Sequence, residues 1–427
     1  MKVLWLCNIM LPKIAEHLHK EVNHKEGWLS GIYDRLSQSN FLLENGEKLE
    51  LGVCFPVNNE AETAEIQLGD MTAFAFYEDI SHPEIYEEKL EESLGAIVQK
   101  FQPDLVHCFG TEYPHTLAMT RAFPYPEKIL VGIQGLCGEC AEVYMASLPE
   151  KVQNARTFRD ILKRDSLKEQ KEKFAKRGEN ERKALKNVGH ITGRTDWDYG
   201  CTNKVSKARY HFMNETLRSV FYEGNWEYEK CIPHSIFLSQ GDYPLKGLHF
   251  VLEAMPLILE KYPDTTLLIA GNDLTKSKTL MEKIKISAYG KYLRKLICEK
   301  RLQDKVHFLG RLTAAQMKQQ FLESNLYLCS SILENSPNSL GEAMLLGVPS
   351  IAADTGGIPS VFTDKKDGLL FERGNVKALA NCVIEMFNDS KMQQVYSENA
   401  KRHARKTHDP DTNYHRLLEI YGEIVCK

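Results

Sequence analysis

Glu334 and Glu342 stand in a segment rich in small polar residues, with seven residues between them. The apolar run Leu-Tyr-Leu-Cys before this segment predicts a buried parallel strand. Behind it we expect Ser336 to cap a helix that has Pro337 at its first position and ends at Gly347. Free N–H groups and the positive end of the helix dipole meet at such a helix start, which predicts a phosphate-binding site there.

The two glutamates indicate what lies on either side of that phosphate. Carboxylates do not bind phosphate, but they accept hydrogen bonds from hydroxyl groups, and sugars consist largely of hydroxyls. A phosphate cradle between two such acceptors predicts a ligand with sugar on both sides of a diphosphate, which is the form of a nucleotide sugar. The alternative is that Glu342 only complements the helix dipole and Glu334 is a solvated loop residue. The local pattern leaves both interpretations open.

The spacing of the two glutamates, followed by A-M-L-L-G-V-P-S-I-A-A-D and T-G-G-I-P, resembles the donor site of family 4 retaining glycosyltransferases of the bacterial surface or capsular polysaccharide type. The resemblance is strongest over Phe237–Phe371. It implies an α/β chain with the GT-B fold, in which two Rossmann-like doubly wound domains face each other across a cleft and a C-terminal helix crosses back to the first domain. It also implies that Glu342 holds the ribose and Glu334 the transferred sugar. The diphosphate would then meet the backbone N–H groups of Asn338, Ser339 and Leu340.

The loop S-Q-G-D-Y-P-L-K-G is a second candidate phosphate site, because it joins a predicted strand to a predicted helix. Its Lys246 would place a positive charge beside the diphosphate. The resembled family has an arginine ahead of the Lys-Gly pair at this turn, whereas this chain has Gln240 or Gly241. We therefore expect a second cation to come from Arg194 or Arg311, or backbone N–H groups to replace it.

Two further strand ends complete the predicted donor site. The runs 266–271 and 306–311 read as strands, and the resemblance places the nucleotide base along the tip of the second one. Gly271 and Phe308 are therefore expected at the donor. The donor itself would be a nucleotide diphosphate sugar of the UDP or GDP type, which is a co-substrate, and no cofactor is expected.

The acceptor side is predicted in the first half of the chain. The buried run 103–110 ends in glycine, and open α/β sheets bind ligands beyond the carboxyl ends of their strands. His107, Glu112 and His115 would then lie where acceptor chemistry occurs, although a single histidine of this kind is more often structural. A helix start and another strand tip add Gly27, Trp28 and Gln134 to the acceptor side.

Neither the cysteines nor the paired aspartates predict a metal site. A single C-x-x-C at 137–140 has no second pair, as a zinc site would need. Asp196 and Asp198 form a D-x-D pattern, but Thr195 reads as the cap of a helix, so we interpret the pattern as a decoy. The 11 cysteines are odd in number and many stand in apolar runs, which is typical of reduced thiols in a cytoplasmic protein.

The stretch 156–187 is rich in lysine and arginine, although the whole chain carries a net charge of -4. We expect one long helix there, either resting on an anionic membrane surface, where a lipid-linked acceptor would be found, or presenting a solvated face. The overall charge favours no nucleic-acid partner. The chain shows no apolar run of the roughly 20 residues that span a bilayer, and we expect a cytoplasmic protein, peripheral on the membrane at most.

At 427 residues the chain is expected to form two domains. We expect a first domain over 1–207, an inter-domain segment over 208–235, a second domain over 236–410 and a terminal helix over 411–427. The predicted function is metal-independent, retaining transfer of a hexose-type sugar to a glycan or lipid-linked acceptor. The alternatives are a sugar-nucleotide epimerase of the same fold and a non-catalytic two-lobed sugar-binding protein.

Overall fold

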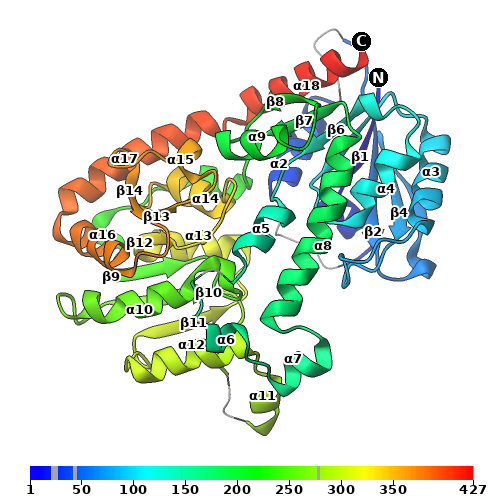
Figure 1. Cartoon of the computed structure of the whole chain (residues 1–427). Coiled ribbons are helices and arrows are strands. Elements are labelled where there is room, and N and C mark those ends of the chain that lie inside the picture. Colours follow the sequence, from blue (N-terminus) through cyan, green and yellow to red (C-terminus); the bar gives the residue numbers. More distant parts are fainter. Residues whose placement is uncertain (21–26, 42–45, 146, 277–278, 427) are drawn as a thin grey trace. The chain divides into compact units, whose positions relative to one another are not determined.

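The computed structural model describes residues 1–20, 27–41, 46–145, 147–276 and 279–426 (Figure 1). The chain forms two compact units. Unit 1 consists of Met1–Ala141, Lys173–Leu217 and His408–Lys427, and unit 2 of Glu142–Glu172 and Arg218–Thr407. Each unit is built on one predominantly parallel sheet with helices on its faces, as expected for two Rossmann-like domains.

The sheet of unit 1 has eight strands, and every neighbouring pair is parallel except β3 and β4. In spatial order the strands are β3 (Ala64–Leu68), β4 (Met71–Tyr77), β2 (Glu50–Val57), β1 (Lys2–Leu6), β5 (Leu105–Phe109), β6 (Ile129–Gly132), β7 (His190–Gly193) and β8 (Arg209–Phe212). The helices of this unit are α1 (Pro12–His17), α2 (Gly27–Gln38), α3 (Lys89–Phe101), α4 (Pro114–Ala122), α5 (Cys137–Val143), α8 (Leu167–Lys186), α9 (Asp196–Asn203) and α18 (Pro410–Val425), with the first residues of α8 and the last of α5 assigned to unit 2.

Alternation along β1 distributes its side chains between two cores, because successive residues of a strand point to opposite faces. Trp5 packs in the core that α2 and α18 cover, and its indole N–H donates to the Tyr421 hydroxyl at 2.9 Å. Leu4 packs in the other core, with Leu94 of α3 and Met119 of α4. The C-terminal helix α18 is therefore part of unit 1 although 190 residues of unit 2 separate it from Leu217 (Arg218–Thr407).

The sheet of unit 2 has six strands and is parallel throughout. In spatial order these are β11 (Val306–Gly310), β10 (Thr266–Ala270), β9 (Ile232–Leu238), β12 (Ser324–Cys329), β13 (Ser350–Asp354) and β14 (Gly368–Glu372). Its helices are α6 (Glu150–Gln153), α7 (Phe158–Lys163), α10 (Leu248–Leu259), α11 (Leu280–Lys285), α12 (Ala288–Glu299), α13 (Ala314–Glu323), α14 (Asn338–Leu346), α15 (Ile358–Val361), α16 (Val376–Asn388) and α17 (Ser390–Thr407). Strands β9 and β12 are neighbours in the middle of the sheet, so the loops after them lie at the same edge.

The structure corrects three expectations about elements. The run His190–Thr195 was expected to be the last strand of the first half, but β8 follows it and pairs with β7. The single helix expected over the basic stretch is divided into α7 and α8, because Arg164 has a left-handed backbone with φ of 48°. Residues 142–172, placed in a first domain over 1–207, group instead with unit 2, and the division between the units falls after Leu217.

Candidate donor site in unit 2 and polar cluster in unit 1

The strand, loop and helix expected around Glu334 are present as β12 and α14, and the helix ends at Gly347 with φ of +77°. The cap is Pro337 rather than Ser336, because the backbone of the proline is still extended, with ψ of 115°, and no side chain caps the helix. Within the described chain, the N–H groups of Asn338 and Ser339 have no hydrogen-bond partner, whereas that of Leu340 donates to the Pro337 carbonyl at 2.9 Å. Two of the three expected phosphate donors are therefore available.

The loop after β9 is fastened to the loop after β12 by backbone contacts. The Ile332 N–H donates to the Leu245 carbonyl at 2.7 Å, and the Ser330 hydroxyl donates to the Lys246 carbonyl at 2.8 Å. Gly247 has φ of +70°, and a Cβ on it would lie 1.9 Å from the Ser330 carbonyl oxygen. Only glycine allows this close approach, which fixes Lys246 beside the segment that carries Glu334.

A buried tyrosine ties the same two loops together at their strand ends. The Tyr327 hydroxyl lies 3.1 Å from the Ser239 hydroxyl and 2.8 Å from the Ser339 hydroxyl. Tyr327 stands on β12, Ser239 follows β9 and Ser339 is in the first turn of α14. The two phosphate candidates recognised in the sequence thus form one continuous surface at the carboxyl edge of the sheet.

Lys246 and Glu334 form an ion pair at the centre of this surface. The Lys246 ammonium lies 2.5 Å from the Glu334 carboxylate, which also accepts from the Ser331 hydroxyl at 2.7 Å. Their side chains are 19% and 16% exposed, so solvent still reaches both. Burial disfavours the Lys246 ammonium most strongly, but Glu334 together with Tyr243 and Cys329 outweighs that effect, and the pKa of Lys246 is raised well above its usual value.

Glu342 is paired with an arginine that the sequence analysis did not identify. Its two carboxylate oxygens accept from Nε and Nη2 of Arg218 at 2.7 and 2.6 Å, and its side chain is 3% exposed. Burial raises the pKa of Glu342, although Arg218 opposes the shift. A ribose hydroxyl would have to share these oxygens with Arg218, which is feasible because a carboxylate offers about four lone-pair positions.

The remaining expected donor residues are spread along the same sheet edge. The Gln240 side-chain amide donates to Asp242 at 2.8 Å, and Gly241 packs closely against Leu248. Gly271, at the end of β10, donates its N–H to the Gly310 carbonyl at 2.8 Å. Phe308 lies on β11 and is half-buried. Arg311 directly follows β11 and is exposed.

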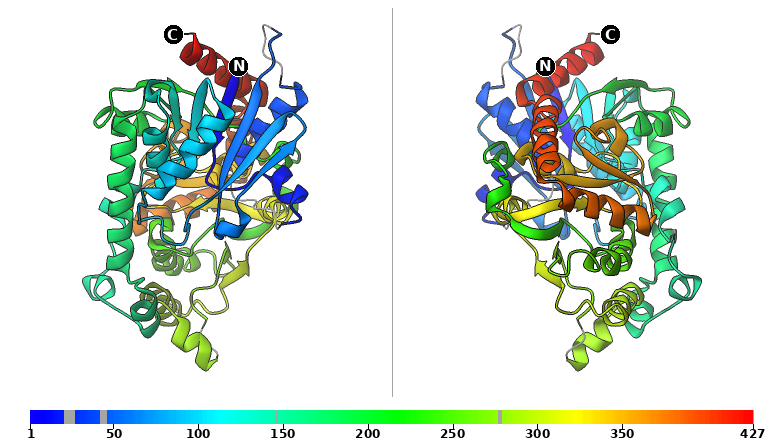
Figure 2. Two further views of the ribbon diagram at one scale, coloured as in Figure 1. Left: turned by 90° about the vertical axis from the view of Figure 1, so that its right-hand side faces the viewer. Right: turned by 90° about the vertical axis from the view of Figure 1, so that its left-hand side faces the viewer.

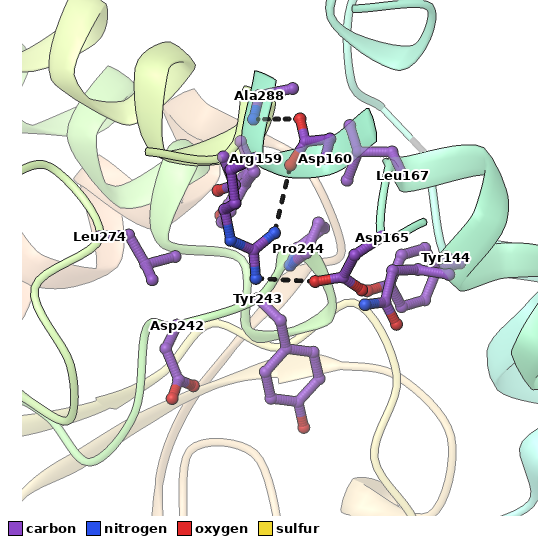
Figure 3. Close-up of a pocket in the computed structure, with 13 residues that line it drawn as sticks. Tyr144, Arg159, Asp160, Asp165, Leu167, Asp242, Tyr243, Pro244, Leu274 and Ala288 are labelled. Carbon is purple, nitrogen blue, oxygen red and sulfur yellow. Dashed lines mark hydrogen bonds and ion pairs between the residues drawn. The ribbon is translucent and has the colours of Figure 1, made fainter. Parts of the chain in front are cut away.

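A cavity of about 130 Å³ lies beside the loop of Lys246, within unit 2 (Figure 3). Asp242, Tyr243 and Pro244 of that loop form part of its wall. The opposite wall comes from 142–172 and includes Arg159, which pairs with Asp165 at 2.7 Å. Segment 142–172 is thus a structural component of the region next to the candidate donor site, which its sequence did not indicate.

In unit 1, the two histidines expected on the acceptor side are interior groups. His107 is 1% exposed, its Nδ1 lies 2.7 Å from the Tyr421 hydroxyl, and burial lowers its pKa to about 3. His115 is fully buried, and its ring nitrogens lie 2.6 Å from Glu78 and 3.0 Å from Asn8. These contacts give both histidines structural partners, and His115 has neither nitrogen left for a substrate.

Glu112 and Gln134, by contrast, are only partly buried. Glu112 accepts from the Asn8 side-chain amide at 3.3 Å and from the Gly135 N–H at 3.0 Å. Because His115 holds the other end of the Asn8 amide, the chain from Glu78 through His115 and Asn8 orients the Glu112 carboxylate. His115 therefore positions Glu112.

Arg194, which the sequence offered as a second cation for the diphosphate, has its hydrogen-bond partners within unit 1. It belongs to unit 1, is 8% exposed, forms an ion pair with Glu215 and donates to the Gln134 side chain at 3.3 Å. These residues line a small pocket with His107 and Thr192 at the ends of β5, β6 and β7. Within the described chain, His107 Nε2, Thr192 Oγ1 and Arg194 Nε are buried without a hydrogen-bond partner. The pocket is therefore equipped for one small polar group.

The other expected positions have structural explanations or are only partly described. Thr195 caps α9 and accepts from the Asp198 N–H, as expected. Asp198 is fully buried and accepts from the Arg194 N–H at 3.1 Å. Gly27 begins α2, as expected, while the side chain of Trp28 lies outside what the structure describes. Among the described residues no group of three His, Cys, Asp or Glu side chains converges as a metal site.

Residues 234–403 match the family model described as "Glycosyl transferases group 1". This region begins within β9 and ends within α17, and over that part the chain is similar to a glycosyltransferase family. The chain is also similar to a putative glycosyltransferase, YtcC, of Bacillus subtilis, with 26% identity over 184 residues that make up 43% of each protein. The chain spans less than half the length of the curated relatives it matches first.

Two solved structures share the fold over the whole chain. Sucrose-phosphate synthase from Thermosynechococcus elongatus has a TM-score of 0.69 at 15% identity, with 100% of this chain and 99% of that chain covered. HepE of Anabaena, solved in complex with UDP and glucose, has a TM-score of 0.66 at 15% identity, with 99% and 100% covered. The chain has the GT-B fold.

None of its described helices combines the length and apolar character that a bilayer span would need.

Proposed function

We propose that the protein is a retaining glycosyltransferase that moves a hexose-type sugar from a nucleotide diphosphate sugar to a glycan or lipid-linked acceptor in polysaccharide synthesis. The observation that carries this proposal is the surface of unit 2 where Lys246, Glu334 and the unpartnered N–H groups of Asn338 and Ser339 meet. It offers one cation and two N–H groups to a diphosphate and a carboxylate to sugar hydroxyls. The similarity to HepE, which was solved with UDP and glucose, favours a UDP-type donor.

Binding of the donor would exchange the partners of Lys246. Before binding, the ammonium is neutralised by Glu334. A diphosphate carries more negative charge than one carboxylate, so it would draw the ammonium toward itself and leave Glu334 to accept hydroxyl hydrogen bonds from the transferred sugar. Lys246 and the two N–H groups would then stabilise charge that develops on the leaving diphosphate, an effect typically worth about 2.7–4 kcal/mol per donor.

The ribose end of the donor is assigned to the Arg218–Glu342 pair. Arg218 fixes the carboxylate in one orientation, because a guanidinium binds both oxygens at once. In unit 1 we assign acceptor recognition to partly buried Glu112 and Gln134, with the adjoining pocket taking a hydroxyl group or a water. No metal is assigned a role, since protein cations and helix N–H groups would balance the diphosphate.

Transfer assays with a panel of UDP- and GDP-sugars test this assignment. Glu334→Ala and Lys246→Ala are each expected to lower sugar transfer at least about tenfold, while the exposed control Lys261→Ala retains activity. Product with the anomeric configuration of the donor, formed equally well with chelator, would support retention without a metal. Full activity in both variants would refute the site, and conversion of the donor sugar without any acceptor would identify an epimerase instead.

A further inference from the structure

An exposed apolar surface lies on α7 and α11 of unit 2. Phe158, Ile161 and Leu162 of α7 are 65%, 63% and 73% exposed. Met281 and Ile284 of α11 are also exposed, and α7 and α11 contact each other. These five side chains form what we call the α7–α11 surface. In both views of Figure 2, α11 lies at the bottom of the picture, with α7 close by.

Exposure of α7 is a fixed property of the fold. Thr157 and Asp160 form a reciprocal capping box at the start of α7. Asp160 is 1% exposed and accepts from the Ala288 N–H at 2.9 Å, which anchors the inner face of α7 to α12. Residues three and four apart share one face of a helix, so anchoring Asp160 turns Phe158, Ile161 and Leu162 outward. Large apolar groups held outward together mark an interaction site.

The charges around this surface are predominantly positive. Exposed cations flank its apolar residues in the sequence, namely Arg156, Lys163, Arg164, Lys168 and Lys285. The nearby carboxylates are already engaged. Asp160 is buried and Asp165 pairs with Arg159. Glu169 lies 3.9 Å from Arg156, and Glu282 accepts from the Thr279 N–H at the start of α11. Apolar side chains surrounded by cations complement an anionic bilayer, whose interface offers hydrocarbon below a layer of phosphates.

We propose that the α7–α11 surface docks the protein on an anionic lipid bilayer. Phe158, Ile161 and Leu162 would enter the boundary between headgroups and acyl chains, and the flanking lysines and arginines would contact lipid phosphates. This places the contact at the break between α7 and α8, whereas the sequence suggested the whole basic stretch 156–187. Farther along α8, the apolar side chains are covered: Leu167 is buried, and the Arg177 guanidinium lies 4.8 Å from the centre of the Phe174 ring.

Sedimentation of the full-length protein with vesicles tests the surface without any donor or acceptor. Wild type is expected to sediment with mixed phosphatidylcholine and phosphatidylglycerol vesicles and to stay in solution with pure phosphatidylcholine. Leu162→Asp should weaken the partition at least about tenfold, because it places a charge among the inserted side chains. The matched control is Val395→Asp on α17, which is 53% exposed in the same unit and should bind as wild type does.

A charge variant and a folding control complete the experiment. Lys163→Glu combined with Lys168→Glu should weaken binding to the anionic vesicles by several fold, and added salt should reduce this electrostatic part. Unchanged thermal unfolding of Leu162→Asp would exclude a folding defect. Equal vesicle binding by wild type and Leu162→Asp would overturn the proposal. So would concentration-dependent self-association that Leu162→Asp abolishes, because the surface would then bind a second copy of the chain.

The outcome is separable from that of the proposed function. Nucleotide-sugar binding in solution, followed by thermal shift, should be the same for Leu162→Asp and wild type, since Leu162 is 73% exposed and does not line the cavity beside the donor loop. Loss of vesicle binding with retained donor binding would support both proposals. Vesicle binding by a protein that binds no nucleotide sugar would leave the docking surface standing and refute the donor site.

Discussion

Glu181, a buried glutamate of unit 1, is held differently from the two glutamates of the candidate donor site in unit 2. In unit 2, Glu334 and Glu342 each face a cation, which is Lys246 in one case and Arg218 in the other. In unit 1, Glu181 accepts hydrogen bonds from the Thr111 hydroxyl and from two backbone N–H groups, which are neutral donors. The charges of Glu334 and Glu342 are therefore balanced by cations before any ligand binds, whereas a negative charge on Glu181 would have no cation to balance it.

The consequence for Glu181 is visible in its proton affinity. Burial raises the pKa of Glu181 to about 7, and the hydrogen bonds from Thr111, Cys137 and Gly138 oppose that shift only in part. Around the donor loop of unit 2 the charges cancel in pairs, so a diphosphate can enter by exchanging partners instead of meeting an isolated cation. A site for an anion and an interior carboxylate thus differ in how their charges are compensated.

The largest effect is expected from removal of Arg218. Arg218→Ala would leave the Glu342 carboxylate buried without its bidentate partner, which typically lowers the free energy of unfolding by about 3–5 kcal/mol. Urea unfolding of the purified protein measures this loss. The double variant Arg218→Met with Glu342→Leu serves as control, because removing both charges removes the unpaired group. A double variant as unstable as Arg218→Ala would contradict the assignment of the loss to an uncompensated carboxylate.

The second effect is a pH dependence that originates at Glu181. Its pKa in the folded protein is raised from 4.5 to about 7, so the folded state binds the extra proton. The stability that it contributes is therefore complete below pH 4.5 and is lost as the pH rises through about 7, with a total of about 3 kcal/mol.

Urea unfolding of wild type and Glu181→Gln across this pH range checks the sign. The glutamine variant cannot titrate at this position, so the difference in unfolding free energy between the two proteins should change steadily from pH 4.5 to about 7 and then level off. The corresponding comparison for Glu91→Gln serves as a reference, because hydrogen bonds from the Tyr86 hydroxyl and from Arg121 lower the pKa of Glu91 below its usual value. A constant difference between wild type and Glu181→Gln would show that the buried carboxylate does not titrate in this window.

The sequence predicted the structural features that depend on neighbouring residues, and it missed contacts between residues that are far apart in the chain. The strand before Glu334 and the helix end at Gly347 follow from local signals, namely an apolar run and a glycine with positive φ. Arg218 stands 124 residues from Glu342 in an irregular segment, so no local pattern could pair them. Burial of a carboxylate requires a partner, but the sequence does not say which one.

Two other errors have different causes. His115 stands in a favourable position beyond a strand end, but only tertiary packing shows that Glu78 and Asn8 occupy its ring nitrogens. The break between α7 and α8 left a readable signal: Ser166 and Glu169 bond reciprocally, in the S-x-x-E pattern of a helix start. The high helix propensity of the surrounding lysines and arginines masked this start.

The third prediction concerns the backbone that brings Lys246 to Glu334. Gly247→Ala would force a Cβ to within 1.9 Å of the Ser330 carbonyl at a residue with φ of +70°, so the loop must shift. The left-handed backbone alone costs about 1–2 kcal/mol for a non-glycine residue, and the shift should also lower sugar transfer. Gly200→Ala on α9 is the control, because a Cβ there meets nothing within 4 Å and alanine favours the helix. Equal stability of the two variants would contradict the contact.

The smallest effect on stability is expected at the ion pair that matters most for the proposed transfer. Lys246→Met should change the free energy of unfolding by less than about 1 kcal/mol, because solvent reaches both partners and a partly exposed pair contributes little. The same substitution should lower transfer at least about tenfold, since methionine cannot compensate the leaving diphosphate. Nucleotide-sugar binding, turnover and urea unfolding are measured for both variants. We expect Lys246→Met to lose turnover but little stability, and Arg218→Ala to lose much more stability. If Lys246→Met lost as much stability as Arg218→Ala and kept its turnover, the pair would be a structural link between two loops and the exchange of partners would be wrong.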